Sequence, residues 1–177
     1  HLEGKQVVAA AEAVRRIRAA VAARRDENFL VTARTDVRSL HGLDATIDRA
    51  KAYVDAGADA IFPEALRELG EFEKVASAVD VPVLANMTEF GKSELLTTSQ
   101  LASAGVQIVI YPVTLFRLAM GAAEAGLTEI AAAGTQRALV PQMQTRKRLY
   151  ELVDYAGYAA FDTDIFTSTD PDHADWS

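Results

Sequence analysis

Four short apolar segments, each closed by a charged or polar residue, constrain the fold of this chain more than any other feature. They are Phe29–Asp36, Ala60–Glu64, Val81–Asn86 and Val106–Pro112. The steps from Arg34 to Glu64, from Glu64 to Asn86 and from Asn86 to Tyr111 are 30, 22 and 25 residues, which leaves room each time for a strand, a helix and two connections. Because the apolar residues are nearly continuous and do not alternate with polar ones, the segments are typical of buried strands in a parallel sheet.

Amphipathic or alanine-rich patterns between and after these segments predict helices. They cover residues 5–25, 43–54, 66–79, a short stretch capped by Thr98 or Ser99 and ending at Gly105, 115–133 and 142–155. The similar fragments 55–62 and 102–109 each join a helix end, a glycine and a buried strand, which indicates a repeated βα unit. We therefore expect an α/β fold of the (β/α)8 TIM-barrel type. Four units are half of such a barrel and leave two unpaired sheet edges, so the chain is a fragment or a partner segment completes the sheet.

Composition narrows the class of protein. A chain of 177 residues suits a single domain, here residues 1–177 with a frayed acidic tail over 162–177. A net charge of −7 with dispersed Lys and Arg argues against nucleic-acid binding, and the absence of cysteine excludes disulfides and thiol nucleophiles within these residues. No apolar run reaches the ~20 residues of a membrane span, so we expect a cytoplasmic enzyme with no membrane partner. The His1-Leu-Glu-Gly opening suggests that the sequence begins inside a longer protein.

Three of the four segments carry a polar or charged candidate at or near their carboxyl end: Arg34, Glu64 and Asn86. The carboxyl ends of parallel strands meet at one edge of a sheet, where ligand sites form, so these groups predict a site for a polyanionic substrate. Each also has a structural interpretation. Arg34 could form an ion pair with Asp36 or Glu64, and Asn86 could form a plain turn. Glu64 could instead hold Mg²⁺ through water or bind a substrate hydroxyl.

Two further arginines are candidates. Arg117 lies at the start of a predicted helix, where a cation is mildly unfavourable, so a bound anion explains it better than a solvated surface does. Arg146 belongs to a basic cluster on a helix, for which a solvated face is the default interpretation.

Five sequence motifs, in order, resemble the isocitrate lyase/phosphoenolpyruvate mutase superfamily, and within it the branch that cleaves methylisocitrate. They are Ala33–Asp36, Phe62–Ala65, Leu84–Gly91, Tyr111–Arg117 and Met143–Glu151. The resemblance spans residues 1–165. It implies that this chain supplies the second half of the barrel, its last four βα units, together with C-terminal helices.

The resemblance also implies roles for individual residues. His1 would be the last residue of a Lys-x-Cys-Gly-His loop whose cysteine is the catalytic acid/base, and His1, Arg34 and Glu64 would be catalytic. The implied substrate contacts are Arg34, Glu64, Asn86, Met87, Thr88, Arg117 and Arg146. The Mg²⁺ cofactor would be held by acidic residues upstream of His1, so no metal ligand is expected in this chain.

The implied reaction is the Mg²⁺-assisted retro-aldol cleavage of (2S,3R)-2-methylisocitrate, a small tricarboxylate, to pyruvate and succinate in the methylcitrate cycle of propionate catabolism. Sister activities are the alternative: oxaloacetate decarboxylase, dimethylmalate lyase or phosphonopyruvate hydrolase. A third interpretation is an inactive fragment that serves in assembly, because the catalytic cysteine and the metal-binding half are absent from these residues. The resemblance further implies a homotetramer with exchanged C-terminal helices.

Overall fold

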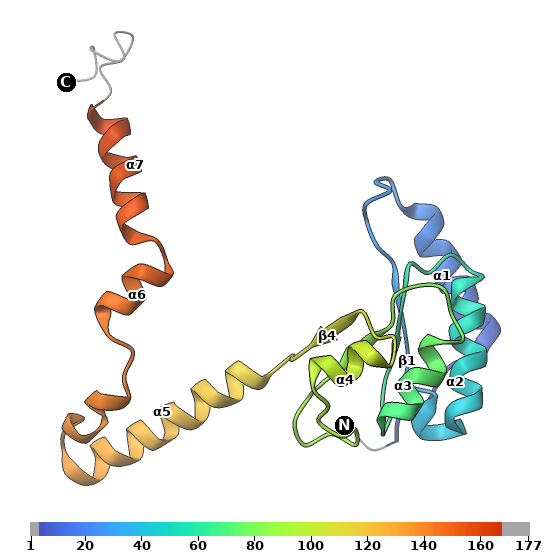
Figure 1. Ribbon diagram of the computed structural model, residues 1–177, viewed down its shortest axis with the longest axis horizontal. Helices are drawn as coiled ribbons and strands as arrows, with labels where there is room; N and C mark the ends of the chain where they lie inside the picture. Colours follow the sequence, from blue (N-terminus) through green and yellow to red (C-terminus); the bar gives the residue numbers. More distant parts are fainter. Residues whose placement is uncertain (1–3, 168–177) are drawn as a thin grey trace. The chain divides into compact units, whose positions relative to one another are not determined.

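The computed structural model describes residues 4–167 (Figure 1). The chain forms two compact units, one ending at Leu118 and the other beginning at Ala119. The first unit alternates helices and strands. Its elements are α1 (Ala10–Ala23), β1 (Thr32–Thr35), α2 (Arg38–Val54), β2 (Ala60–Pro63), α3 (Leu69–Ala76), β3 (Leu84–Asn86), α4 (Thr98–Ser103), β4 (Ile108–Ile110) and the start of α5 (Thr114–Ala133). All four predicted strands are therefore present, each inside its apolar segment.

The strands run parallel in chain order. β1 pairs with β2 and β3 pairs with β4, both in parallel register. One parallel bridge, Ile61 to Val83, connects the two pairs, and the Ile61 amide donates to the Pro82 carbonyl at 2.9 Å. Because every strand points the same way, the residues that follow them gather at one edge of the sheet.

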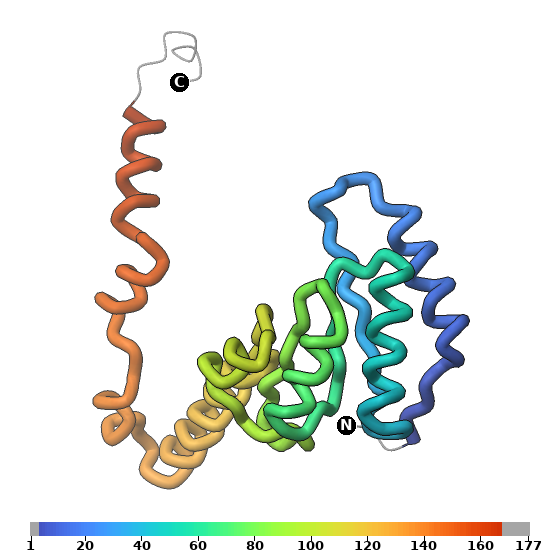
Figure 2. The backbone as a smooth tube through the Cα atoms, turned by 45° about the vertical axis from the view of Figure 1, so that its right-hand side comes forward, coloured from blue at the N-terminus to red at the C-terminus, as the bar shows by residue number. Residues whose placement is uncertain are grey.

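The core lies between the strands and the helices that cover one face of them. Figure 2 shows α1, α2 and α3 side by side, in blue, teal and green. Ala33, Ile61 and Ala85 of the strands, and Val83 directly before β3, are at most 4% exposed and pack in two apolar clusters with side chains of the helices. The helical side chains in these clusters include Ala50, Tyr53, Phe72, Val75 and Leu101. Alternate strand residues therefore point away from this core, which is where polar side chains are tolerated.

Several helix starts differ from the sequence prediction. The helix predicted over 5–25 begins at Ala10, and the helix predicted over 66–79 begins at Leu69. α2 begins at Arg38, because one helical turn precedes a kink at Gly42, whose φ of +88° suits glycine. The predicted start near residue 43 marks the part after that kink. α4 is capped by Thr97 rather than Thr98 or Ser99, and Thr97 and Gln100 form a reciprocal capping box.

The second unit is helical. It continues α5 and adds a 3₁₀ turn (Arg137–Gln142), α6 (Arg146–Leu152) and α7 (Tyr155–Thr167). The single helix predicted over 142–155 is wrong: the Thr145 side chain caps α6, and Asp154, with φ of +49°, separates α6 from α7. The tail predicted from residue 162 is helical as far as Thr167. The rest of that tail, 168–177, lies outside the described residues.

Within the described part of the second unit, no residue is buried. Many of its large apolar side chains are more than half exposed, among them Leu127, Tyr158, Phe161 and Phe166. Across residues 4–167, no helix combines the length and the apolar character needed to cross a membrane.

Candidate active site

Arg34 lies at the carboxyl end of β1 and points away from the core. The strand alternates, with Ala33 and Thr35 buried and Arg34 exposed. The Arg34 guanidinium donates through Nε to Asp36 Oδ2 at 2.9 Å and through Nη2 to Asp36 Oδ1 at 3.1 Å. The same Nη2 lies 3.2 Å from Glu64 Oε2, and the guanidinium stacks over the Phe62 ring, 4.7 Å from its centroid. Both ion pairs that the sequence allowed for Arg34 are therefore formed together.

Glu64 and Asn86 meet Arg34 from the next two strands. Glu64 follows β2 directly and is only 6% exposed. Asn86 is the last residue of β3, and its Nδ2 donates to Glu64 Oε2 at 3.3 Å. The Asn86 Oδ1 atom is buried and has no hydrogen-bond partner among residues 4–167. Because a buried acceptor without a partner is costly, this oxygen is suited to receive a donor from a ligand or water.

Asp36 lies between two cations, Arg34 and Lys5. Lys5 Nζ donates to Asp36 Oδ1 at 2.5 Å. The hydrogen bonds from Arg34, followed in importance by the one from Lys5, outweigh burial and lower the pKa of Asp36 from 3.8 to about 2. Asp36 in turn raises the pKa of Arg34 above its ordinary value. Both groups are therefore charged at neutral pH.

Arg117 is held by a carboxylate of the protein itself. Arg117 Nη1 donates to Glu89 Oε2 at 2.7 Å and to the Glu89 backbone carbonyl at 3.0 Å, and it stacks over the Phe90 ring. The Thr114 hydroxyl donates to the other oxygen of Glu89. This hydroxyl, with smaller contributions from the Glu89 amide and from Arg117, lowers the pKa of Glu89. The anion expected beside Arg117 is thus, in this structure, Glu89.

The remaining predicted residues are placed differently. Met87 is 2% exposed and lies in the apolar core, so its side chain does not join the strand ends. Thr88 follows it and is half-buried. Arg146 begins α6 in the second unit, where it lines a cavity with Tyr150 and Tyr155. His1 lies outside the described residues.

Sequence reasoning did not identify Asp36 and Glu89 as site residues. For Asp36 a signal existed, since it follows Arg34 by two residues and so shares its side of the strand. For Glu89 there was none. Its partners Arg117 and Thr114 are distant in the sequence, and only the folded loop after β3 brings them together.

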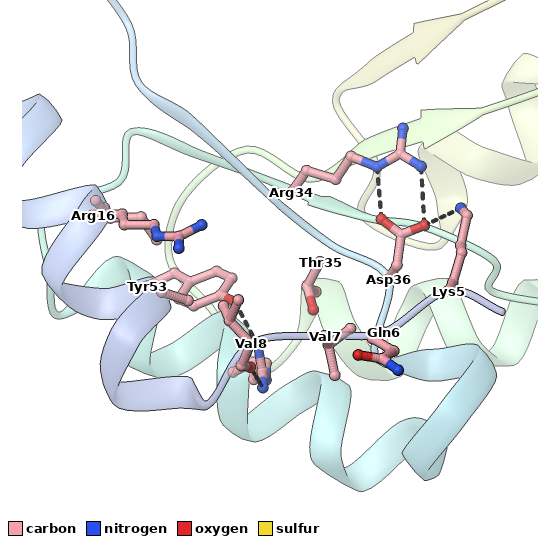
Figure 3. A pocket seen from close by; sticks show the side chains of 12 residues that line it. Lys5, Gln6, Val7, Val8, Arg16, Arg34, Thr35, Asp36 and Tyr53 are labelled. Carbon is pink, nitrogen blue, oxygen red and sulfur yellow. Dashed lines mark hydrogen bonds and ion pairs between the residues drawn. The ribbon is translucent and has the colours of Figure 1, made fainter.

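A cavity of about 450 Å³ lies beside Arg34 (Figure 3). Its walls come from residues 5–8, α1, β1 and α2. The charged side chains that line it are Lys5, Arg16, Arg34, Asp36 and Arg49. Four of these are cations and one is an anion, so the cavity favours a negatively charged occupant over a cation.

The described residues do not form a metal centre. Residues 4–167 contain no group of three or more His, Cys, Asp or Glu side chains placed to hold an ion. Glu64 brings one carboxylate to the strand ends, whereas Mg²⁺ is held by about six oxygens, several of them from water. These residues alone therefore do not fit a complete Mg²⁺ site.

Known proteins share both the sequence and the fold. A family model described as phosphoenolpyruvate phosphomutase matches residues 1–131. The chain is 56% identical over 167 residues to a Corynebacterium glutamicum protein named probable 2-methylisocitrate lyase 2, covering 94% of this chain and 54% of that protein. It is 49% identical to the 2-methylisocitrate lyase of Salmonella typhimurium, covering 88% and 52%. The chain thus spans about half the length of these relatives.

Solved structures share the fold of this chain. Oxaloacetate acetylhydrolase in complex with 3,3-difluorooxalacetate matches with a TM-score of 0.80 and 30% identity, over 96% of this chain and 57% of that one. Phosphonopyruvate hydrolase in complex with oxalate and Mg²⁺ matches with a TM-score of 0.73 and 27% identity, over 92% and 59%. Together with the four parallel βα units, these likenesses confirm the predicted fold class, half of a (β/α)8 barrel.

Proposed function

Because this chain belongs to the phosphoenolpyruvate phosphomutase family, we propose that it supplies half of the active site of a carbon–carbon lyase that cleaves 2-methylisocitrate. The observation that carries the proposal is the meeting of Arg34, Glu64 and Asn86 from three successive strands. The names of the relatives, 44% to 56% identical to this chain, support the choice of substrate.

The proposed reaction is a retro-aldol cleavage. The C2 hydroxyl of 2-methylisocitrate loses its proton, the C2–C3 bond breaks, and C2 becomes the carbonyl of pyruvate. The electron pair remains on C3, which takes up a proton to give succinate. Negative charge therefore forms first on an oxygen and then on the succinate half. Preorganised cations at these two positions would lower the barrier most, because they need no reorganisation as the charge develops.

Residues of the strand ends suit these tasks. Arg34 forms an ion pair with Glu64, which also accepts from Asn86, and we assign to Arg34 the oxygen that becomes negative. The partnerless Asn86 Oδ1 would accept a hydrogen bond from the substrate, and Thr88 lies two residues further along. We assign to Arg117 a carboxylate of the succinate half, with Glu89 holding its guanidinium in place. Arg146 and His1 remain proposals that rest on the family resemblance.

Magnesium dependence is part of the proposal. A related complex contains oxalate and Mg²⁺. In such sites the ion polarises oxygen atoms and offsets developing negative charge. The described residues do not form its site, so we derive no step through it.

We also propose that the protein is a cytoplasmic homotetramer in which C-terminal helices are exchanged between subunits. The support is the second unit, whose described residues include many large apolar side chains and no buried one. Apolar patches of that kind mark contact surfaces. A monomer in solution scattering would contradict this assignment.

The proposal is tested by a substrate panel. Release of pyruvate is followed with methylisocitrate, dimethylmalate, oxaloacetate and phosphonopyruvate, with Mg²⁺ present and after its removal. We expect turnover of methylisocitrate that is lost with the metal. Turnover of the other acids alone would reject the substrate assignment in favour of a sister activity.

An intact mass of the purified protein tests the fragment interpretation. A mass near 19.1 kDa, with no turnover of any of these acids, would favour an inactive assembly piece. A larger mass together with turnover would support the enzyme.

A further inference from the structure

Asp36 is the connection between the Arg34 guanidinium and the chain segment that precedes α1. Both of its oxygens are used: Oδ2 accepts from Arg34 Nε at 2.9 Å, and Oδ1 accepts from Arg34 Nη2 at 3.1 Å and from Lys5 Nζ at 2.5 Å. Figure 3 shows the three side chains in this order, with Asp36 in the centre.

This arrangement fixes the orientation of the Arg34 guanidinium. Two parallel hydrogen bonds to one carboxylate hold the plane of an arginine side chain far better than a single contact does. The Phe62 ring covers one face of that plane at 4.7 Å, and Glu64 Oε2 lies 3.2 Å from Nη2. Of the three guanidinium nitrogens, only Nη1 has no hydrogen bond within residues 4–167. In Figure 3 this nitrogen points away from Asp36.

Two contacts attach residues 5–8 to other residues that line the cavity beside Arg34. Lys5 bonds to Asp36, and Arg49 of α2 donates to the Val8 backbone carbonyl. Arg49 also donates to the Tyr53 hydroxyl at 3.2 Å, so the second contact is anchored in the core. The segment, which forms one wall of the cavity in Figure 3, is thus pinned at both ends.

From this geometry we propose that Asp36 is a positioning residue: it presents Arg34 Nη1 to the substrate, and Lys5 makes that orientation depend on the placement of residues 5–8. The proposal rests on the proposed function for the identity of the substrate, but not for the contacts themselves. It adds a group that acts through Arg34 without touching substrate.

The first test compares two aspartates under the same substitution, in the protein expressed from its whole gene. Asp36→Asn removes the charge that holds Arg34. Asp59→Asn is the matched control, because Asp59 also pairs with an arginine, Arg24 at 2.8 Å, but at the amino end of β2. We expect Asp36→Asn to lower kcat by on the order of 10² while KM changes less than about threefold, since a misplaced group loses rate more than affinity. Asp59→Asn should leave both constants unchanged.

A double-mutant cycle separates positioning from a direct or merely structural role. Arg34→Lys cannot form the paired contact with Asp36. If Asp36 acts through Arg34, adding Asp36→Asn to Arg34→Lys should lower kcat by less than about twofold further. Multiplying effects in the double variant, or a kcat of Asp36→Asn within threefold of the wild type, would overturn the proposal.

The link to residues 5–8 has a readout that needs no activity. Lys5→Met should speed amide hydrogen exchange across residues 5–8 and lower kcat by several-fold, and it serves in place of Asp36→Asn if that variant does not fold. Exchange and kcat both unchanged in Lys5→Met would overturn the link. Kinetics are run with whichever acid of the panel the wild type turns over, so a wrong substrate assignment and a wrong role for Asp36 give different results.

Discussion

The two ends of the same strands use similar side chains in different ways. At the amino end, Asp59 accepts from Arg24 Nη1 and from the Val31 amide, both at 2.8 Å. The Gln107 side chain accepts from the Val83 amide at 2.9 Å. These polar groups form hydrogen bonds that join one segment of the backbone to another, which is a structural role.

At the carboxyl end an Arg–Asp pair is also present, but here one hydrogen-bond donor and one acceptor have no partner among the described residues. Arg34 keeps Nη1 and Asn86 keeps Oδ1 without partners within residues 4–167. A donor and an acceptor left together beside a buried carboxylate are what a ligand needs for recognition. The comparison shows that an ion pair by itself does not mark a site, whereas incomplete pairing at the strand ends does.

The largest expected effect separates the arginines of the two ends. Arg34→Lys should lower kcat/KM by about 10³-fold, because lysine cannot keep the paired contact and the presented nitrogen together. Arg24→Lys, its counterpart at the amino end, should leave kcat/KM unchanged and cost about 1 kcal/mol of stability or less. Steady-state kinetics and urea unfolding measure the two quantities. Equal losses of activity in both variants would mean that the two ends do not differ in function.

Substitutions of Met87 test how the apolar core supports the carboxyl ends of the strands. Met87→Ala should cost about 2–5 kcal/mol in the free energy of unfolding, since the side chain is buried in the core. Met87→Leu should cost less than about 1.5 kcal/mol and leave KM unchanged. A marked rise of KM in Met87→Leu, without loss of stability, would instead place this side chain against the substrate.

Acid should weaken the carboxyl end through Asp36. The pKa of Asp36 is lowered from 3.8 to about 2 in the folded protein, so the unfolded chain binds more protons in that window. Its contribution is therefore complete above the unfolded pKa and is lost as the pH falls through the folded one. Urea unfolding at several pH values should show Asp36→Asn less stable than the wild type by about 1 kcal/mol near pH 6, with the gap closing toward pH 2. A gap that stays constant with pH would contradict this assignment.

The smallest effect concerns Glu89, the carboxylate beside Arg117. Glu89→Gln keeps an oxygen for Arg117 but removes a negative charge from the neighbourhood of the proposed tricarboxylate substrate. We expect KM to fall about threefold at low ionic strength and the difference to vanish in high salt. Glu73→Gln, which removes a carboxylate from an exposed position on α3, is the control and should leave KM unchanged.

Local patterns predicted the strands and the residues that close them, because continuous apolar runs and strand ends are encoded within a few positions. They did not predict α7, since the acidic residues Asp162 and Asp164 suggested a frayed tail, yet the segment is helical to Thr167. The Thr97 cap was missed because Thr98 and Ser99 carry the same capping chemistry. Contacts between distant segments, such as Glu89 with Arg117 and Lys5 with Asp36, are set only by the folded backbone.

A crystal structure of the protein with pyruvate and succinate bound tests the central claim most directly. The account predicts that a carboxylate or carbonyl oxygen of these products lies within hydrogen-bond distance of Arg34 Nη1, with product atoms also in contact with Asn86. Products bound only elsewhere, with Arg34 and Asn86 in contact with protein and solvent alone, would contradict it.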